Sequence, residues 1–131
     1  MSTVYGEIMV TFDTTQKGLE IVLKDYQVEA MKYLWSLEEG QGASSRDVWI
    51  NCNVALVGVK TISRASIINF CNAMVDDKML GFHEITGKGG HRRIYKKIYD
   101  EEGTKRFLTS LIIQKLSQEW PTATKAVLEN L

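Results

Sequence analysis

Cysteine, histidine and proline are scarce in this chain of 131 residues. The two cysteines, Cys52 and Cys71, have neither a CxxC spacing nor another metal-ligand spacing, so we expect buried, reduced thiols. A redox switch is the minor alternative. No metal and no cofactor is expected.

Catalytic motifs are also missing. The sequence has no GxSxG, no HExxH and no P-loop. Its two histidines, His83 and His91, lie close together, and the TGKGG segment at 86–90 lacks the GK[ST] ending of a phosphate loop. We therefore do not expect an enzyme.

Long hydrophobic runs are absent as well. No apolar run approaches the roughly 20 residues of a membrane helix, and the first residues are too polar for a signal peptide. We expect a cytoplasmic protein with no membrane partner. The length, with 44% hydrophobic and 24% charged residues, suits one globular domain.

The chain has no net charge, with 16 basic and 16 acidic residues, and this at first argues against a nucleic-acid partner. The distribution is uneven, however. Residues 60–97 carry eight basic and three acidic side chains, a local charge of +5, whereas residues 1–59 carry −4 and residues 98–131 carry −1. Because DNA affinity depends on local neutralisation of phosphates, this segment keeps a DNA partner open. A basic solvated face explains the charge equally well.

The N-terminal half predicts short strands followed by helices. Residues 4–12 and 19–23 have the composition of strands, with turn formers between them. A first helix is expected from an N-cap at Asp25 to a stop at Gly40, and a second from Ser44 or Ser45. The stretch NVALVGVKTI at 53–62 has no sustained period, so we interpret it as a helix end and a connection.

The third helix has the clearest pattern. Ser63 suits an N-cap, because its hydroxyl can accept from free N–H groups of the first turn. Apolar residues then repeat at helical spacing on one face: Ile67, Phe70, Cys71, Met74 and Val75. The opposite face is small, polar and nearly free of acids, which is unusual for a solvated helix.

A hairpin and two more helices are expected after the third helix. Leu80–Ile85 and Ile94–Tyr99 flank the tip TGKGG, whose glycines can adopt positive φ. The next helix runs from about Asp100 to Trp120, and a short one follows at 122–131. The apolar residues of the longer helix cover more than one face, which favours a dimer interface over the alternative of packing on its own domain. The candidate interface residues are Phe107, Leu108, Leu111, Ile112, Leu116 and Trp120.

Three helices followed by a glycine-tipped hairpin is the order of a winged helix-turn-helix. We predict an α+β, mainly α fold with a two-stranded β-wing and C-terminal dimerisation helices. Its parts are an N-terminal extension at 1–23, a winged-helix domain at 24–99 and a helical dimerisation segment at 100–131. The third helix and the wing are expected on the same side of the molecule.

In that architecture the third helix enters the major groove and the wing reaches the backbone or minor groove. The candidate DNA-binding residues are Ser63, Arg64, Ser66, Ile68, Asn69 and Asn72 on the helix, and Lys88, His91, Arg92 and Arg93 on the wing. Asparagine can pair with adenine, and isoleucine can meet a thymine methyl.

Less specific roles are open for several of these residues. Asn69 and Asn72 could be ordinary solvated residues. One of Arg92 and Arg93 could pair with Glu84 across the hairpin, and His91 could be a plain surface residue.

Three segments resemble the helical core of BlaI/MecI penicillinase repressors: LKDYQVEAMKYLW, SSRDVW and SRASIINFCNAMVDDKMLGF. The segment GGHRRIYKKIYDEEGTKRFL resembles the wing and following helix of MarR- and PadR-type regulators. The resemblance implies a homodimeric repressor that binds double-stranded DNA. A small-molecule effector, as in MarR-like proteins, stays open, and no residue marks a pocket for it. The 53–62 connection is longer than in penicillinase repressors, and the C-terminal region has no clear match to theirs.

The alternative function is a winged-helix module that docks on proteins of the transcription or replication machinery. The zero net charge and the unplaced N-terminal strands motivate it.

Overall fold

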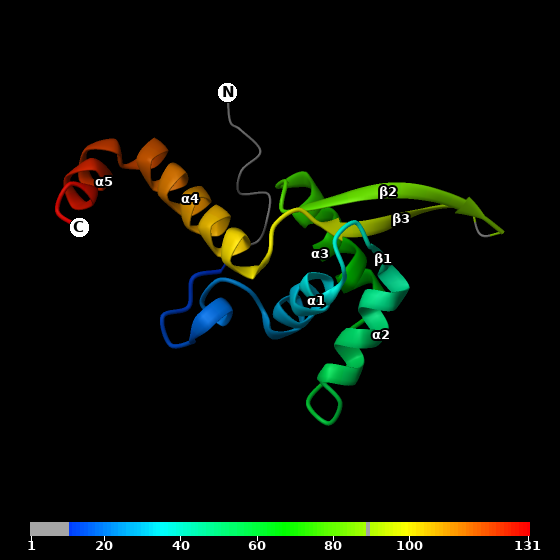
Figure 1. The fold of residues 1–131 in the computed structure, drawn as a ribbon. Helices are drawn as coiled ribbons and strands as arrows, with labels where there is room; N and C mark the ends of the chain where they lie inside the picture. Colours follow the sequence, from blue (N-terminus) through cyan, green and yellow to red (C-terminus); the bar gives the residue numbers. More distant parts are fainter. Residues whose placement is uncertain (1–10, 89) are drawn as a thin grey trace.

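The computed structural model describes residues 11–88 and 90–131. Its helices and strands are shown in Figure 1 and follow one another as η1 (Gly18–Ile21, a 3-10 helix), α1 (Asp25–Ser36), β1 (Ala43–Ser44), α2 (Ser45–Ala55), α3 (Arg64–Asp76), β2 (Leu80–Gly87), β3 (Gly90–Lys97), α4 (Glu101–Glu119) and α5 (Pro121–Leu128). The fold is α+β and mainly helical, and its order is compatible with a winged helix.

The sheet is small and antiparallel, with strand order β1-β3-β2. β2 and β3 form the expected hairpin, paired from Leu80 opposite Lys97 to Gly87 opposite Gly90. Gly90 has a φ of 91° and so uses the freedom of glycine, whereas Gly87 does not, and residue 89 lies outside the described residues. The hairpin projects from one end of the molecule, and α4 and α5 extend at the other (Figure 1).

The core lies between α1, α2, α3, the base of the sheet and the first half of α4. The predicted face of α3 is buried at Ile67, Phe70, Cys71 and Met74, and Val75 packs against this core. Trp35 Nε1 donates to Thr104 Oγ1 at 3.2 Å, which fastens the start of α4 to α1. The hairpin and the first half of α4 therefore pack against the same hydrophobic core.

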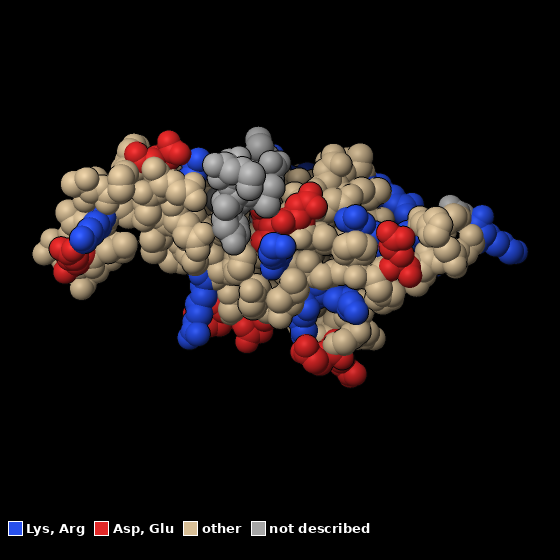
Figure 2. Space-filling view, turned by 90° about the horizontal axis from the view of Figure 1, so that it is seen from above, with Lys and Arg blue, Asp and Glu red and all other residues tan. Residues whose placement is uncertain are grey.

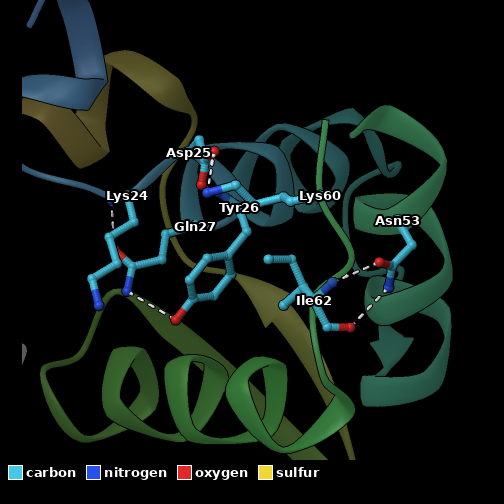
Figure 3. Close-up of polar contacts among 7 residues, drawn as sticks. All are labelled: Lys24, Asp25, Tyr26, Gln27, Asn53, Lys60 and Ile62. Carbon is cyan, nitrogen blue, oxygen red and sulfur yellow. Dashed lines mark hydrogen bonds and ion pairs between the residues drawn. The ribbon is translucent and has the colours of Figure 1, made fainter. Parts of the chain in front are cut away.

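The connection between α2 and α3 is pinned by side chains (Figure 3). Asn53 Nδ2 donates to the Ile62 carbonyl at 3.1 Å, and the Ile62 N–H donates to Asn53 Oδ1 at 2.8 Å. Lys60 Nζ lies 2.9 Å from Asp25 Oδ2 and holds the pKa of that carboxyl below its ordinary value. Gly58, with φ 82°, makes the turn after α2. These contacts fix where α3 begins.

Several predicted boundaries need correction. The strand expected at 19–23 is wrong, because residues 18–21 form η1 and the chain packs beneath α4. Of the strand expected at 4–12, residues 4–10 lie outside the described residues, and 11–12 are not a strand.

The first helix also differs from its prediction. Its N-cap is Lys24, not Asp25, and it ends at Ser36, not near Gly40. Lys97 Nζ donates to the carbonyls of Trp35 and Leu37 at 3.1 and 2.7 Å. This contact from β3 gives the last carbonyl groups of α1 a hydrogen-bond donor, so the helix can end at Ser36. By contrast, Ser63 caps α3 as predicted, and Ser44, one of the two residues at which the second helix was expected to begin, is the N-cap of α2.

The first half of α4 packs on its own domain. Leu108 and Leu111 are buried in the core, and Phe107 packs on Tyr99 with ring centroids 5.4 Å apart. Leu108 and Leu111, which were expected at a dimer interface, are therefore taken up by the core of their own domain, whereas Phe107 is only partly buried. Among the described residues, no helix is both long and apolar enough to cross a membrane.

Candidate nucleic-acid interface

A groove runs between the outer face of α3 and the wing. Its volume is about 780 Å³, and it is lined by Ser45, Arg64, Ile68, Asn72, Glu84, Gly87, Lys88, Gly90, His91, Arg92, Arg93 and Tyr95. The groove brings together three of the six candidate residues on α3 and all four on the wing. Ser45 and Tyr95 were not candidates from the sequence, since one begins α2 and the other is a buried strand residue. The helix and the wing therefore present their polar residues on the same side.

Ser63 and Ser66 serve the start of α3. Ser63 Oγ accepts from the Ser66 N–H at 3.1 Å, and the two hydroxyls lie 2.9 Å apart. Neither lines the groove. Because the acceptor of Ser63 is used in capping, its first role is to stabilise the helix.

Asn69 and Asn72 differ in their surroundings. Asn69 is exposed on α3. Asn72 is half-buried, and its Oδ1 accepts from the Tyr95 hydroxyl at 2.7 Å and from Arg93 Nη1 at 3.1 Å. Asn72 thus lines the groove with its acceptor already occupied by β3, so it has no free Oδ1 for the pairing with adenine that the sequence suggested.

The wing arginines also differ from one another. Arg93 lies opposite Glu84 in the hairpin, but its guanidinium turns to Asn72 and lies 4.0 Å from the centroid of the Phe82 ring. Glu84 Oε2 instead lies 3.8 Å from His91 Nδ1. The alternative of an arginine–Glu84 pair is therefore not realised, and Glu84 contacts His91 instead.

Part of the positive segment is used inside the fold. Lys60 pairs with Asp25, and Lys97 caps the end of α1. Within the described ranges, Arg64, Lys88 and Arg92 are exposed cations that form no ion pair. Figure 2 shows basic side chains projecting from the wing end of the molecule. The groove therefore carries Arg93 and these three cations against the carboxylate of Glu84.

The cations of the wing and the exposed face of α3 suit a polyanion that has a groove wide enough to admit a helix. The first turn of α3 has no acidic residue, and the helix N-terminus adds a partial positive charge. No group of three or more His, Cys, Asp or Glu side chains that could hold a metal is found in the described part of the chain. Both cysteines are buried and reduced.

Comparison with known proteins gives a likeness in fold. No family model matches the sequence, and no curated protein matches it. A solved structure from Methanosarcina mazei Go1, described as a "possible transcriptional regulator", superposes with a TM-score of 0.54 at 13% identity, covering 82% of this chain and 78% of that chain. At this identity the likeness concerns the fold alone: the chain shares its α+β architecture with that protein.

Proposed function

We propose that this protein is a cytoplasmic, non-enzymatic transcriptional regulator that binds duplex DNA through α3 and the β2–β3 wing. The observation that carries the proposal is the groove in which the outer face of α3 meets Lys88, Arg92 and Arg93 of the wing. The name of the structural neighbour supports a regulatory role.

The dimensions of the two elements fit this use. α3 spans 13 residues, about 20 Å at 1.5 Å per residue, which suits insertion into a major groove. Beside it, the tip of the wing is narrow and carries Lys88 and Arg92, so it can reach the neighbouring backbone or minor groove. Asn69 and Ile68 are the side chains of α3 that we assign to base edges.

The salt dependence of binding tests the wing. For the variant Lys88→Ala/Arg92→Ala, we expect the slope of log K against log salt to become shallower by about 2, or roughly 0.9 for each phosphate that is no longer neutralised. Lys32→Ala on α1 is the matched control, since this side chain is 58% exposed and does not line the groove. Absence of duplex binding by the unmodified protein at low salt would refute the proposal.

Sequence reading tests α3. Asn69→Ala is expected to lose discrimination at one base pair by about 1–3 kcal/mol while leaving the salt slope unchanged. Selection of duplex sequences from a random pool measures this preference. Asn51→Ala, an exposed asparagine on α2, is the control. A pool that shows no enrichment with the unmodified protein would argue for binding without sequence specificity.

We further propose a homodimeric repressor. Support comes from apolar side chains exposed where α4 meets α5, with Trp120 64% and Leu116 36% exposed. Two copies joined there would read two half-sites, which raises affinity and specificity. An apolar groove of about 460 Å³ between η1 and α4 is where a small-molecule effector would bind.

A protein-docking module is the second candidate. The observation that favours it is a cluster of exposed apolar side chains on α2 and the turn after it, namely Ile50, Val54, Val57 and Val59. Val57→Asp separates the two functions: loss of a stable protein complex with duplex binding retained would assign this cluster to a protein partner.

A further inference from the structure

The side chain of Asn72 links α3 to the wing. Asn72 lies in the third turn of α3, and both groups that donate to its Oδ1 belong to β3. These are the Tyr95 hydroxyl at 2.7 Å and Arg93 Nη1 at 3.1 Å. One amide oxygen therefore holds two residues on the same face of the wing.

Burial makes this link costly to lose. Tyr95 is 3% exposed, so its hydroxyl depends on an acceptor within the protein. Burial also raises the pKa of Tyr95, which keeps the hydroxyl protonated as a donor. Without Asn72 the Tyr95 hydroxyl would lose its acceptor on α3, and with it the bond that ties β3 to this helix.

Arg93 is held from two sides. Asn72 contacts its guanidinium from the helix, and the ring of Phe82 on β2 lies 4.0 Å beneath it. One of the five N–H donors of the guanidinium is used by Asn72, which leaves others to face the groove. Arg93 is thus fixed in place while still able to meet a phosphate.

We propose that Asn72 is a positioning residue that sets the angle between α3 and the wing and holds Arg93 at the floor of the groove. It acts through Tyr95 and Arg93 and does not itself read a base. The inference rests on the proposed function for its consequence on DNA. Helix and wing then contact the duplex at a fixed spacing, so the protein selects DNA by groove geometry as well as by base edges.

The first test uses the free protein. Residual dipolar couplings of backbone amides give the orientation of the wing relative to α3. We expect Asn72→Ala to change this orientation and Asn72→Asp, which keeps the acceptor, to preserve it. Tyr95→Phe removes one donor without removing the ring, and we expect a smaller change. Unchanged orientation in both Asn72→Ala and Tyr95→Phe overturns the inference, whatever the protein does with DNA.

The second test is a double-mutant cycle on duplex binding. Asn72→Ala is expected to weaken binding about tenfold for all sequences, and the loss in the Asn72→Ala/Arg93→Ala variant should be smaller than the sum of the two single losses, because part of the effect of Asn72 passes through Arg93 and the rest through Tyr95. Asn69→Ala is the matched control, whose effect should add to that of Arg93→Ala. Additive effects of Asn72→Ala and Arg93→Ala, or a loss confined to one base pair, overturn the inference. If the unmodified protein does not bind DNA, the proposed function fails, and the measurement on the free protein still decides the role of Asn72.

Discussion

At the scale of single residues, asparagine side chains order segments that lie outside the regular elements. Asn53 is the clearest case, because it bonds to both backbone groups of Ile62 and to the Trp49 carbonyl. The Trp49 indole adds a further bond to the same Ile62 carbonyl at 2.8 Å. Asn53 thus supplies two of the three side-chain bonds that hold the backbone of Ile62 in the α2–α3 connection.

Replacing this amide should destabilise the fold. We expect Asn53→Ala to lower the free energy of unfolding by about 2 kcal/mol, because the Ile62 N–H loses its partner in a mostly buried position. Urea unfolding followed by circular dichroism measures the change. Asn51→Ala is the control, with a single bond to the Asp47 carbonyl and an exposed side chain, and should stay within about 0.5 kcal/mol. Equal midpoints for the two variants would contradict this role.

The cysteines give a prediction on pH. Burial raises the pKa of Cys71 to about 12 and that of Cys52 to about 11, above the ordinary value of about 9. Below pH 8 both thiols are protonated in the folded and unfolded states, so they add no pH dependence. Between about pH 9 and 11 the unfolded chain loses these protons first, and the free energy of unfolding falls as pH rises.

Two measurements check this behaviour. At pH 8 a thiol reagent should modify the folded protein far more slowly than the protein in denaturant. In the alkaline range, Cys71→Val should lose stability less steeply with pH than the unmodified protein. Rapid modification of folded protein would show that these thiols are accessible.

The sequence alone did not show which basic side chains are paired within the protein. The sequence identified a basic segment, but Lys60 and Lys97 are used by Asp25 and by the end of α1, far away in the chain. Similarly, Asn72 and Asn69 are alike in sequence, and β3 distinguishes them by occupying only Asn72. Partners distant in sequence leave no local pattern.

At the scale of elements, the two-residue strand β1 closes the sheet beside β3. Ala43 pairs with Tyr95 and Ser44 with Ile94. Gly42 precedes β1 where the backbones approach closely: an added Cβ would lie 2.6 Å from Ile94 Cγ2 and 2.8 Å from the Tyr95 carbonyl oxygen. Glycine is therefore required here by space.

We expect Gly42→Ala to destabilise the protein by about 1–3 kcal/mol, because β1 must move away from β3. Thermal unfolding measures the effect. Gly87→Ala is the matched control, since nothing lies within 4 Å of its added Cβ. If the two variants melt at the same temperature, β1 does not depend on this close approach.

Long elements with a regular hydrophobic pattern were predicted well, and elements of only a few residues were not. α3 and the hairpin follow from the spacing of Ile67 to Met74 and from the glycine tip, because local pattern and tertiary burial agree there. η1 and β1 were missed because segments of four and two residues carry no period. The sequence predicted only that the third helix and the wing lie on the same side of the molecule. The groove between them results from the packing of α3 against β3, which the sequence pattern does not specify.

At the scale of the whole molecule, the wing and the α4–α5 end lie far apart (Figure 1). The second half of α4 extends away from the core, and α5 packs back against α4 (Figure 1). Three large apolar side chains are exposed there: Trp120, Val127 and Leu128. Exposed apolar side chains that lie close together are typical of a surface that binds another molecule. The proposed self-association would cover these side chains.

We expect Trp120→Asp to raise the dimer dissociation constant at least 100-fold, since it places a charge in an apolar contact. Sedimentation over a range of protein concentrations measures this. Val57→Asp is the control, because Val57 is 78% exposed on the turn between α2 and α3, away from α5. A strict monomer at micromolar concentration for the unmodified protein would remove the dimer from the proposal.

The unbroken course of α4, from the buried Thr104 to Glu119, has a mechanical consequence. Each residue inserted or deleted in its exposed half would turn α5 by about 100° around the helix axis and displace it by about 1.5 Å. In a pair joined through α5, the length of this rod would set the phase between the two DNA-facing surfaces. Changing that length by one residue would dephase the two half-sites without touching either groove.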